Sequence, residues 1–438
     1  MKKPVIFALI ILAALVGMSL FYFLGTPPPK VSLSPEAGLL DARREVSLNL
    51  AAEGGLLKKL TVAAVQAEKS FEVLAKDYPS GSHQALETFN LEKAGLKEGA
   101  FTLQIRATSS AASFGADRTT SKGYSFTIES KPLELAVVSV AHNINQGGAG
   151  LVVYTVSKDV EKTGVVFGEQ FFPGYRQSGD YYACLFPFPY NMEPGKYAPK
   201  VIAVDRGGNE RQMSINYHLI AKSFSTDRIN LTDNFLAKIA AGFKDRFPQV
   251  TAPLELFLKA NGEQRQQDLK LIYDYGRKSS PTPLWQGTFL RMPKTAPLGG
   301  FAQQRTYNYQ GKEVDRQTHL GFDLASLAQA AVPAANRGTV IHAGELGIYG
   351  KCVIIDHGLG LQTIYGHLSQ ISVKPGDHVE SGQIIGNTGA TGMAGGDHLH
   401  FEMTISGQSV NPIEWWDAHW INDNVTGKLA VAKANGSR

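Results

Sequence analysis

A segment near the C-terminal end constrains the fold of this chain most, because its polar and apolar residues alternate without a break. Residues 398–403 read HLHFEM. Successive side chains of a β-strand point to opposite faces, so the three apolar residues are expected to face a core. His398, His400 and Glu402 would then share the other face. The pattern predicts a packed β-sheet with chemically active side chains on one side.

A second segment, residues 318–324, repeats this pattern with the sequence THLGFDL. As one strand, it would point its three apolar residues into a core. His319 and Asp323 would share the opposite face, and Gly321 between them has no side chain that could block a metal. Two potential metal ligands are therefore expected side by side.

A third segment, residues 362–367 with the sequence QTIYGH, would place Thr363, Tyr365 and His367 on one strand face. An isolated histidine is more often a core or surface residue than a ligand. Three strands of one region that each present histidine opposite an apolar face favour a shared site.

The residue types of this region match the needs of hydrolytic zinc chemistry. Catalytic zinc usually takes three protein ligands, from imidazole nitrogen or carboxylate oxygen, and keeps a fourth position for water. The metal lowers the pKa of that water to about 7. A nearby base can accept the proton, and a second donor can stabilise the oxyanion. The histidines and the aspartate therefore predict a zinc-dependent hydrolase.

Other candidates in the region are expected to lie outside the chemistry. His342 and His357 fall beside the predicted strands but outside the three segments, and His378 falls in a predicted turn. Glu402 shares the face of the two neighbouring histidines. It either orders a ligand from behind or lies at the surface on the substrate side, and both interpretations are open.

The spacing His319-x-x-x-Asp323 together with His398-x-His400 resembles the lysostaphin-like, or LytM-type, peptidoglycan metalloendopeptidases. The resemblance covers roughly residues 299–416. The surrounding segments agree with it, namely residues 332–335 (VPAA), 338–340 (GTV), 365–368 (YGHL), 379–386 (VESGQIIG) and 410–412 (VNP).

The resemblance implies that His319, Asp323 and His400 bind Zn²⁺, that His398 is the general base and that His367 stabilises the tetrahedral intermediate. It implies a compact, mostly antiparallel β fold of the duplicated hybrid motif type, with the site in an open groove. The implied substrate is a peptide stem or cross-link of peptidoglycan. The alternative is a non-catalytic LytM-type activator of another wall hydrolase.

Two segments depart from the pattern of this family. Residues 393–397 read MAGGD, where the family usually has Ser-Thr-Gly-Pro or a similar sequence. Upstream, residues 301–305 (FAQQR) match the usual Phe-Gly-x-Arg only loosely. Neither departure removes a ligand, but the first changes the groove wall beside the base and leaves the substrate preference open.

The N-terminus predicts a membrane anchor. Lys2 and Lys3 precede residues 4–24, which carry no charged side chain. At about 1.5 Å per residue a helix of this length spans a hydrocarbon core of about 30 Å. A cleaved signal peptide is the alternative, but its apolar region is usually only about 7–15 residues long. We expect a single-pass protein of the inner membrane, with the rest of the chain facing the periplasm or cell wall.

The remaining chain is expected to be mainly β and to form several domains. After the anchor (1–24) and a proline-rich spacer (25–30), alternating apolar residues separated by turn residues predict a β-sandwich over 31–130. A second β-rich stretch follows over 131–222, and its hairpin-like segment 203–210 (AVDRGGNE) resembles the late hairpin of bacterial Ig-like domains. We therefore expect two Ig-like domains. Apolar residues four apart, beginning at Phe235, predict a helical connector over 223–282, with a second helix over 264–275. The peptidase domain would cover 283–420, followed by a tail (421–438). A sandwich or the connector is a candidate cover for the groove.

Composition limits the partners and the redox chemistry. The formal net charge is only +4, and no basic run with interleaved aromatic residues occurs, so nucleic acid is not an expected partner. The expected partners are peptidoglycan, the inner membrane and a regulatory protein. Cys184 and Cys352 fall in different predicted domains, which favours two buried thiols over a disulfide framework.

Overall fold

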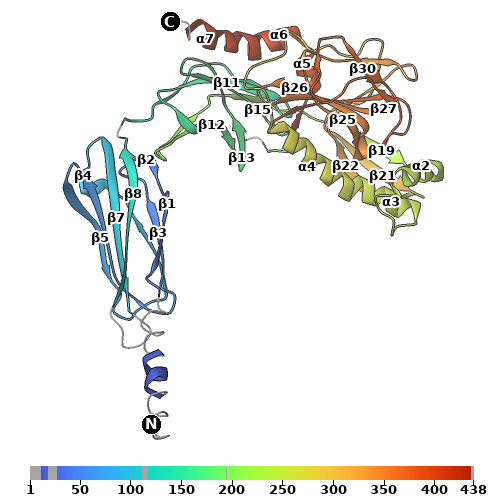
Figure 1. Cartoon of the computed structure of the whole chain (residues 1–438). Coiled ribbons are helices and arrows are strands. Elements are labelled where there is room, and N and C mark those ends of the chain that lie inside the picture. Colours follow the sequence, from blue (N-terminus) through green and yellow to red (C-terminus); the bar gives the residue numbers. More distant parts are fainter. Residues whose placement is uncertain (1–10, 18–26, 111–116, 130, 194, 436–438) are drawn as a thin grey trace. The chain divides into compact units, whose positions relative to one another are not determined.

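The computed structural model describes residues 11–17, 27–110, 117–129, 131–193 and 195–435 (Figure 1). Residues 11–17 are helical. Most of the predicted membrane anchor, residues 4–24, lies outside the described residues. Within the described ranges, no helix has both the length and the apolar character needed to cross a membrane.

The chain forms two compact units. The first consists mainly of residues up to Leu133, and the second contains most residues from Glu134 onward. The first unit confirms the strand-rich prediction for residues 31–129, although its Ig-like classification remains a prediction. One sheet has the order β1(Lys30–Ser34), β3(Val46–Ala51) and β6(Gln84–Phe89). The other has the order β2(Gly38–Leu40), β8(Arg118–Ile128), β7(Gly99–Ser109), β4(Leu57–Gln66) and β5(Lys69–Asp77).

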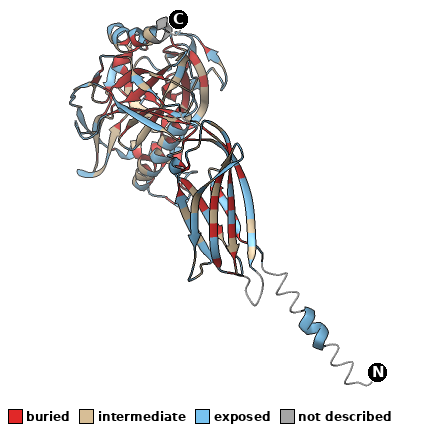
Figure 2. Cartoon of the chain, turned by 90° about the vertical axis from the view of Figure 1, so that its left-hand side faces the viewer, coloured by how far each residue is buried: buried red, intermediate tan, exposed pale blue. Residues whose placement is uncertain are grey.

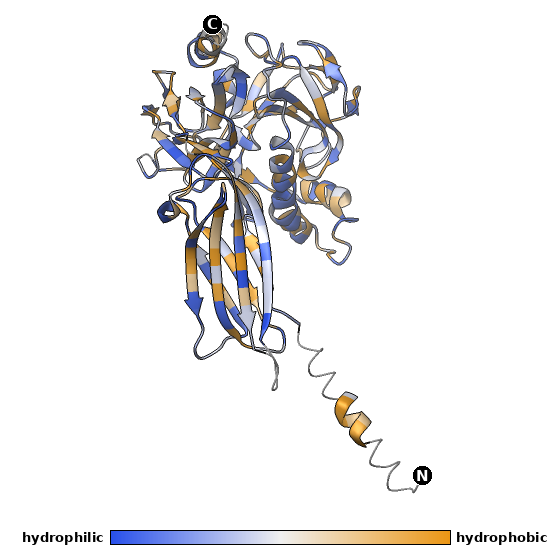
Figure 3. Cartoon of the chain, turned by 60° about the vertical axis from the view of Figure 1, so that its left-hand side comes forward, coloured by the Kyte–Doolittle hydropathy of each residue, from blue (hydrophilic) through white to orange (hydrophobic). Residues whose placement is uncertain are grey.

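The two sheets of the first unit enclose one hydrophobic core, because apolar residues alternate along their strands. The burial pattern of β3 alternates between buried and more exposed residues, and its buried residues Val46, Leu48 and Leu50 face apolar residues of the other sheet, including Leu103 and Ile105. Figure 3 shows the alternation as changing colours along the strands. A 3₁₀ turn, Glu92–Ala94, precedes β7.

The described residues 131–193 and 195–222 form ten further strands, which agrees with the β-rich stretch expected over residues 132–221. One sheet has the order β14(Tyr175–Ser178), β15(Tyr181–Pro187), β11(Ala149–Val156) and β9(Leu135–Val137). Another has the order β13(Gln170–Pro173), β12(Val160–Phe167), β16(Lys200–Asp205) and β17(Glu210–Ser214). A parallel pair joins β10(Asn143–Asn145) to β18(His218–Ile220).

Helices occur where the sequence predicted them between residues 223 and 282, together with one additional strand. That strand, β19(Thr226–Asn230), pairs in parallel with a strand of the predicted peptidase domain. The helices are α2(Asp233–Phe243), α3(Pro253–Lys259), a π-helical turn over Ala260–Gln264 and α4(Arg265–Gly276). Thr232 caps α2 by accepting a hydrogen bond from the backbone N–H of Phe235.

The predicted peptidase domain, residues 283–420 (below, the peptidase region), is built on an eight-stranded sheet. Its order is β20(Ala296–Gly299), β23(Phe322–Ala325), β31(Leu399–Ile405), β27(Leu361–Leu368), β26(Gly350–Gly358), β25(Gly338–Leu346) and β29(His378–Val379), and β32(Gln408–Val410) pairs with β31. The described ladders of this sheet are antiparallel, as expected. Two smaller sheets join β19, β21(Gln303–Tyr309) and β22(Lys312–His319), and β24(Ala331–Pro333), β30(Ile384–Asn387) and β28(Gln370–Ile371).

Short helical segments complete the unit. A 3₁₀ turn, η3(Gly347–Tyr349), links β25 to β26. At the C-terminal end follow α5(Pro412–Trp415), α6(Ala418–Ile421), a second π-helical turn over Asn422–Thr426 and α7(Gly427–Asn435).

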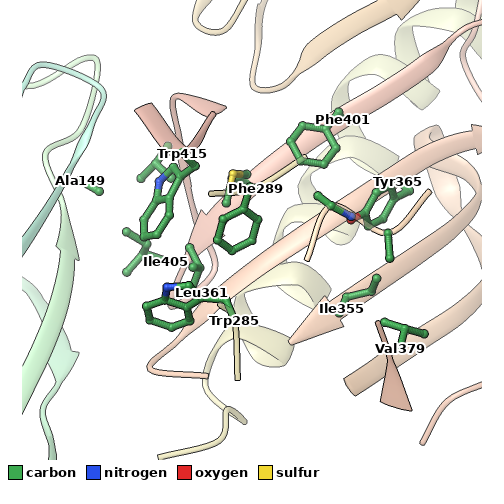
Figure 4. Close-up of a cluster of buried hydrophobic side chains, with 14 of the residues drawn as sticks. Ala149, Trp285, Phe289, Ile355, Leu361, Tyr365, Val379, Phe401, Ile405 and Trp415 are labelled. Carbon is green, nitrogen blue, oxygen red and sulfur yellow. The ribbon is translucent and has the colours of Figure 1, made fainter. Parts of the chain in front are cut away.

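Each face of the large sheet packs on its own hydrophobic core. One core contains Phe401 and Tyr365 of the sheet together with Trp415 and Phe289 (Figure 4), and it includes Leu151 of β11. Buried residues, drawn in red in Figure 2, run along the strands of this unit.

The other core joins Ile354 and Ile364 of the sheet to connector residues such as Phe257. Both cores therefore extend beyond the predicted boundaries of the peptidase domain. Cys184 and Cys352 are buried free thiols, as expected.

Candidate metal centre

The predicted strand over residues 318–324 is wrong in one respect, because the chain turns in its middle. Strand β22 ends at His319, and β23 begins at Phe322 in a different sheet. Leu320 consequently lines a pocket, although we expected it in a core. The two predicted ligands still meet, since His319 Nε2 lies 3.0 Å from Asp323 Oδ1.

The third candidate ligand, His400, comes from the neighbouring strand β31, where it is paired with Asp323. His400 Nδ1 lies 3.0 Å from Asp323 Oδ1 and 3.1 Å from His319 Nε2. All three residues are buried. In a tetrahedral zinc site with bonds of about 2.0–2.1 Å, ligand atoms lie about 3.3 Å apart. The three atoms thus already form a triangle of nearly the size that zinc requires.

The outer hydrogen bonds decide which ring nitrogens face one another. His319 Nδ1 donates to the carbonyl of Gly300 at 2.9 Å, which leaves a lone pair on Nε2. His400 Nε2 lies 3.2 Å from the Glu402 carboxylate, to which it donates, so the neutral His400 ring carries its lone pair on Nδ1. Two lone pairs and a carboxylate oxygen of Asp323 therefore converge. A divalent cation fits such a set of three acceptors.

Charge and burial act in opposite directions at the three groups. Burial lowers the pKa of His319. Burial alone would also lower the pKa of His400, but the carboxylates of Asp323 and Glu402 outweigh it and raise that pKa to about 9. Burial would raise the pKa of Asp323, yet its histidine partners hold it well below its usual range.

His398 and His367 lie beside the triangle. His398 Nε2 is 3.5 Å from Asp323 Oδ1, and the rings of His398 and His367 are 4.9 Å apart between centroids. His398 Nδ1 donates to the carbonyl of Gly396, and His367 Nδ1 donates to that of Thr391, each at 2.9 Å. In its neutral form each ring therefore carries its lone pair on Nε2.

The prediction that Thr363, Tyr365 and His367 share a strand face holds for Thr363 and Tyr365 but is wrong for His367. Tyr365 packs in the core beside Phe401, with ring centroids 5.4 Å apart, and its hydroxyl accepts a hydrogen bond from Thr363. A bulge in the ladder with β26 lies between Tyr365 and Leu368. There His367 adopts a left-handed backbone with φ +62°, and its ring turns to the metal side.

Three contributors to the site were given no firm role by sequence reasoning. Arg305 Nη2 donates to Asp323 Oδ2 at 2.8 Å and so occupies the second oxygen of that carboxylate. Glu402 is fully buried and bonds to His400, which decides between its two open interpretations. Tyr349 donates to Glu402 at 2.8 Å. A sequence signal existed for Arg305, through the loose match of residues 301–305 to the family pattern, but none existed for Tyr349.

A pocket of about 330 Å³ opens onto the three candidate ligands. Its wall includes the unusual segment before His398, through Met393, Gly395, Gly396 and Asp397. Connector residues also line it, namely Asp227, Ile229, Phe235, Phe257 and Arg265. His342, His357 and His378 are not among the residues that line this pocket. His378, which we predicted in a turn, begins strand β29.

Comparison with known proteins finds similarity over the region that carries this site. Residues 317–412 match the model of Peptidase family M23. The C-terminal part of this chain is an M23 peptidase domain.

Curated relatives share this domain. The DD-carboxypeptidase/endopeptidase Mpg of Neisseria meningitidis is 42% identical over 95 residues, which are 22% of this chain and 22% of that protein. The peptidoglycan DD-endopeptidase ShyA of Vibrio cholerae is 38% identical over 96 residues, again 22% of each chain. The chain thus matches about a fifth of the length of these relatives.

Among solved structures, the catalytic domain of lysostaphin from Staphylococcus simulans is 27% identical. The alignment covers 28% of this chain and 92% of that domain, with a TM-score of 0.24.

Proposed function

We propose that this protein is a zinc-dependent endopeptidase that hydrolyses peptide stems or cross-links of peptidoglycan. The observation that carries the proposal is the convergence of His319 Nε2, Asp323 Oδ1 and His400 Nδ1 within 3.0–3.1 Å of one another, at the wall of a pocket. The named activities of the M23 relatives support the choice of substrate.

The chemistry divides between the ligands and the two neighbouring histidines. His319, Asp323 and His400 would hold Zn²⁺, which would polarise the scissile carbonyl and lower the pKa of a bound water. Arg305 keeps the carboxylate of Asp323 oriented and partly neutralises it. His398, with its Nε2 lone pair beside this site, accepts the proton of the attacking water and passes it to the leaving amine. His367 would stabilise the oxyanion by donating from Nε2 once that nitrogen takes up a proton, a step that burial opposes because it lowers the pKa of His367.

Two alanine variants separate metal binding from proton transfer. We expect His398→Ala to keep one zinc ion per chain while hydrolysis of peptidoglycan peptides falls by about 100-fold or more. His400→Ala should lose the metal, because it removes one of three ligands. Wild-type hydrolysis by a zinc-loaded His398→Ala chain would contradict the assigned base. A His398→Ala chain that still fulfils the cellular role without hydrolysis would favour the activator alternative.

We also propose that residues 4–24 anchor the protein in the inner membrane, with the peptidase domain in the periplasm facing the cell wall. The uncharged length of this segment after Lys2 and Lys3 supports the proposal. Protease added to spheroplasts should digest the peptidase domain. Full protection of that domain until the membrane is permeabilised would contradict this topology.

A further inference from the structure

The connector helix carries three buried polar side chains, and burying a polar group costs free energy unless it is hydrogen-bonded. Asn261, Gln264 and Asp268 are exposed by 0%, 4% and 1%. Two of them, Asn261 and Gln264, lie in the π-helical turn Ala260–Gln264, and Asp268 follows one turn later in α4. Widened turns of this kind occur often at functional sites.

Asp268 holds the turn η3 of the peptidase region. Its Oδ2 accepts the backbone N–H of Ile348 at 2.7 Å, and its Oδ1 accepts from Gln264 Nε2 at 2.8 Å. Gly347 gives the carboxylate its space, because a Cβ at that position would lie 2.1 Å from both oxygens of Asp268. The Asp268 carboxylate therefore packs closely against the turn Gly347–Tyr349 and is hydrogen-bonded to it.

The same turn presents Tyr349 to the metal centre. The Tyr349 hydroxyl donates to Glu402 Oε2 at 2.8 Å, and its ring lies 5.4 Å from the ring of His400. Glu402 Oε2 also receives His400 Nε2, while Ser409 donates to Glu402 Oε1 at 2.6 Å. The Glu402 carboxylate thus sets the rotation of the His400 ring, and Tyr349 helps to hold that carboxylate in place.

We propose that Asp268 is a positioning residue of the metal centre. It sets the turn that carries Tyr349, Tyr349 holds Glu402, and Glu402 orients His400 so that Nδ1 faces the other ligands. The inference rests on the proposed zinc function. It makes the connector a part of the metal centre, not only a spacer between domains.

The test is a zinc competition titration against a chromophoric chelator, carried out on the whole chain in detergent. Loss of an outer-shell partner of a metal ligand typically weakens metal binding by about 10–100-fold. We expect Asp268→Ala and Tyr349→Phe each to raise the Kd for zinc by about tenfold. The Kd of the double variant for zinc should be no higher than that of the weaker-binding single variant, because both changes interrupt one chain of contacts.

Two further variants separate positioning from general damage. Asp274→Ala removes an exposed carboxylate from the same helix and should leave the Kd unchanged. Asp268→Asn keeps an acceptor for the backbone N–H of Ile348. Its Kd for zinc should therefore lie between those of the wild type and Asp268→Ala. An unchanged zinc Kd in every folded Asp268 variant would overturn the proposal, as would independent, multiplying effects of the two substitutions. If the Asp268 variants bind zinc more weakly than the wild type but the wild-type chain cuts no peptide, only the proposed function is contradicted.

Discussion

At the scale of single residues, Gly321 shows how an absent side chain brings ligands together. Sequence reasoning expected this glycine to leave room between His319 and Asp323. In the structure, a Cβ at Gly321 would lie 2.5 Å from Cε1 and 2.6 Å from Nε2 of His400. The glycine therefore makes room for the ring of the third ligand, which comes from a different strand.

We predict that Gly321→Ala weakens zinc binding by about tenfold or more, because the new methyl group must displace the ring of His400. Zinc stoichiometry and affinity of the purified variant check this. Gly242→Ala in α2 is the matched control, since a Cβ at Gly242 has no atom within 4 Å among the described residues. Equal zinc affinity of the two variants would show that the ring position does not depend on Gly321.

A second prediction concerns His357, which lies in the core away from the pocket. Its Nδ1 donates to the carbonyl of Arg337 at 2.6 Å, and burial lowers its pKa to about 4. The unfolded chain, with a pKa of about 6.5, then binds more protons between about pH 6.5 and pH 4. His357 therefore makes stability fall as the pH falls through this window. An NMR titration that shows a charged His357 ring in the folded protein at pH 6 would contradict this.

The three candidate ligands could be proposed from sequence because their residue types and spacing pointed to one site. His367 joins the site by another route than the one predicted. Strict alternation would have kept it on the face of Tyr365, and only the bulge with its left-handed backbone turns the ring. Asp268 could not be found, because its partner Ile348 lies 80 positions further along the chain. Long-range contacts of this kind leave no local pattern.

At the scale of elements, the connector differs most from its predicted role. The periodicity of residues 264–275 predicted a helix that the structure has as Arg265–Gly276. Its packing was not predictable, because a helix period indicates an apolar face but not the surface that covers it. Phe257, which is fully buried, packs on Tyr307 of β21 with ring centroids 5.3 Å apart, and both line the metal pocket.

This packing predicts the outcome of a truncation. Residues 283–438 lack the connector half of a shared hydrophobic core and one wall of the pocket. We expect this fragment to lose most of its zinc affinity and hydrolysis relative to residues 31–438. Both quantities can be measured on the two purified fragments. A higher rate for residues 283–438 would instead support the hypothesis that the connector covers the groove.

At the scale of the whole molecule, two compact units predict two separate unfolding events. Within the second unit, the peptidase region is joined to the preceding strands by Glu414. Its two carboxylate oxygens accept the side chain of Asn145 at 2.6 Å and the backbone N–H of Ala149 at 2.9 Å. The hydrophobic core that includes Leu151 crosses the same boundary. The predicted domain boundary after residue 222 therefore does not separate two hydrophobic cores, because one core contains residues from both sides of it.

We predict two calorimetric transitions for residues 31–438, each affected by its own substitutions. Glu414→Ala leaves two donors without their acceptor and should cost the second unit about 1–3 kcal/mol, which lowers its Tm by a few degrees. Glu87→Ala, which removes the acceptor of Lys76 and Tyr78 in the first unit, should shift only the other transition. A shift of both transitions by either variant would show that the units unfold together.

The most direct test of the central claim measures zinc content and peptide hydrolysis on the same preparation of residues 31–438. We predict one zinc ion per chain and cleavage of a defined peptide bond in purified muropeptides, located by mass spectrometry of the fragments. A chelator should abolish the cleavage, and one equivalent of zinc should restore it. A fully zinc-loaded chain that leaves every muropeptide uncut, or cleavage that persists in the metal-free chain, would contradict the proposed function.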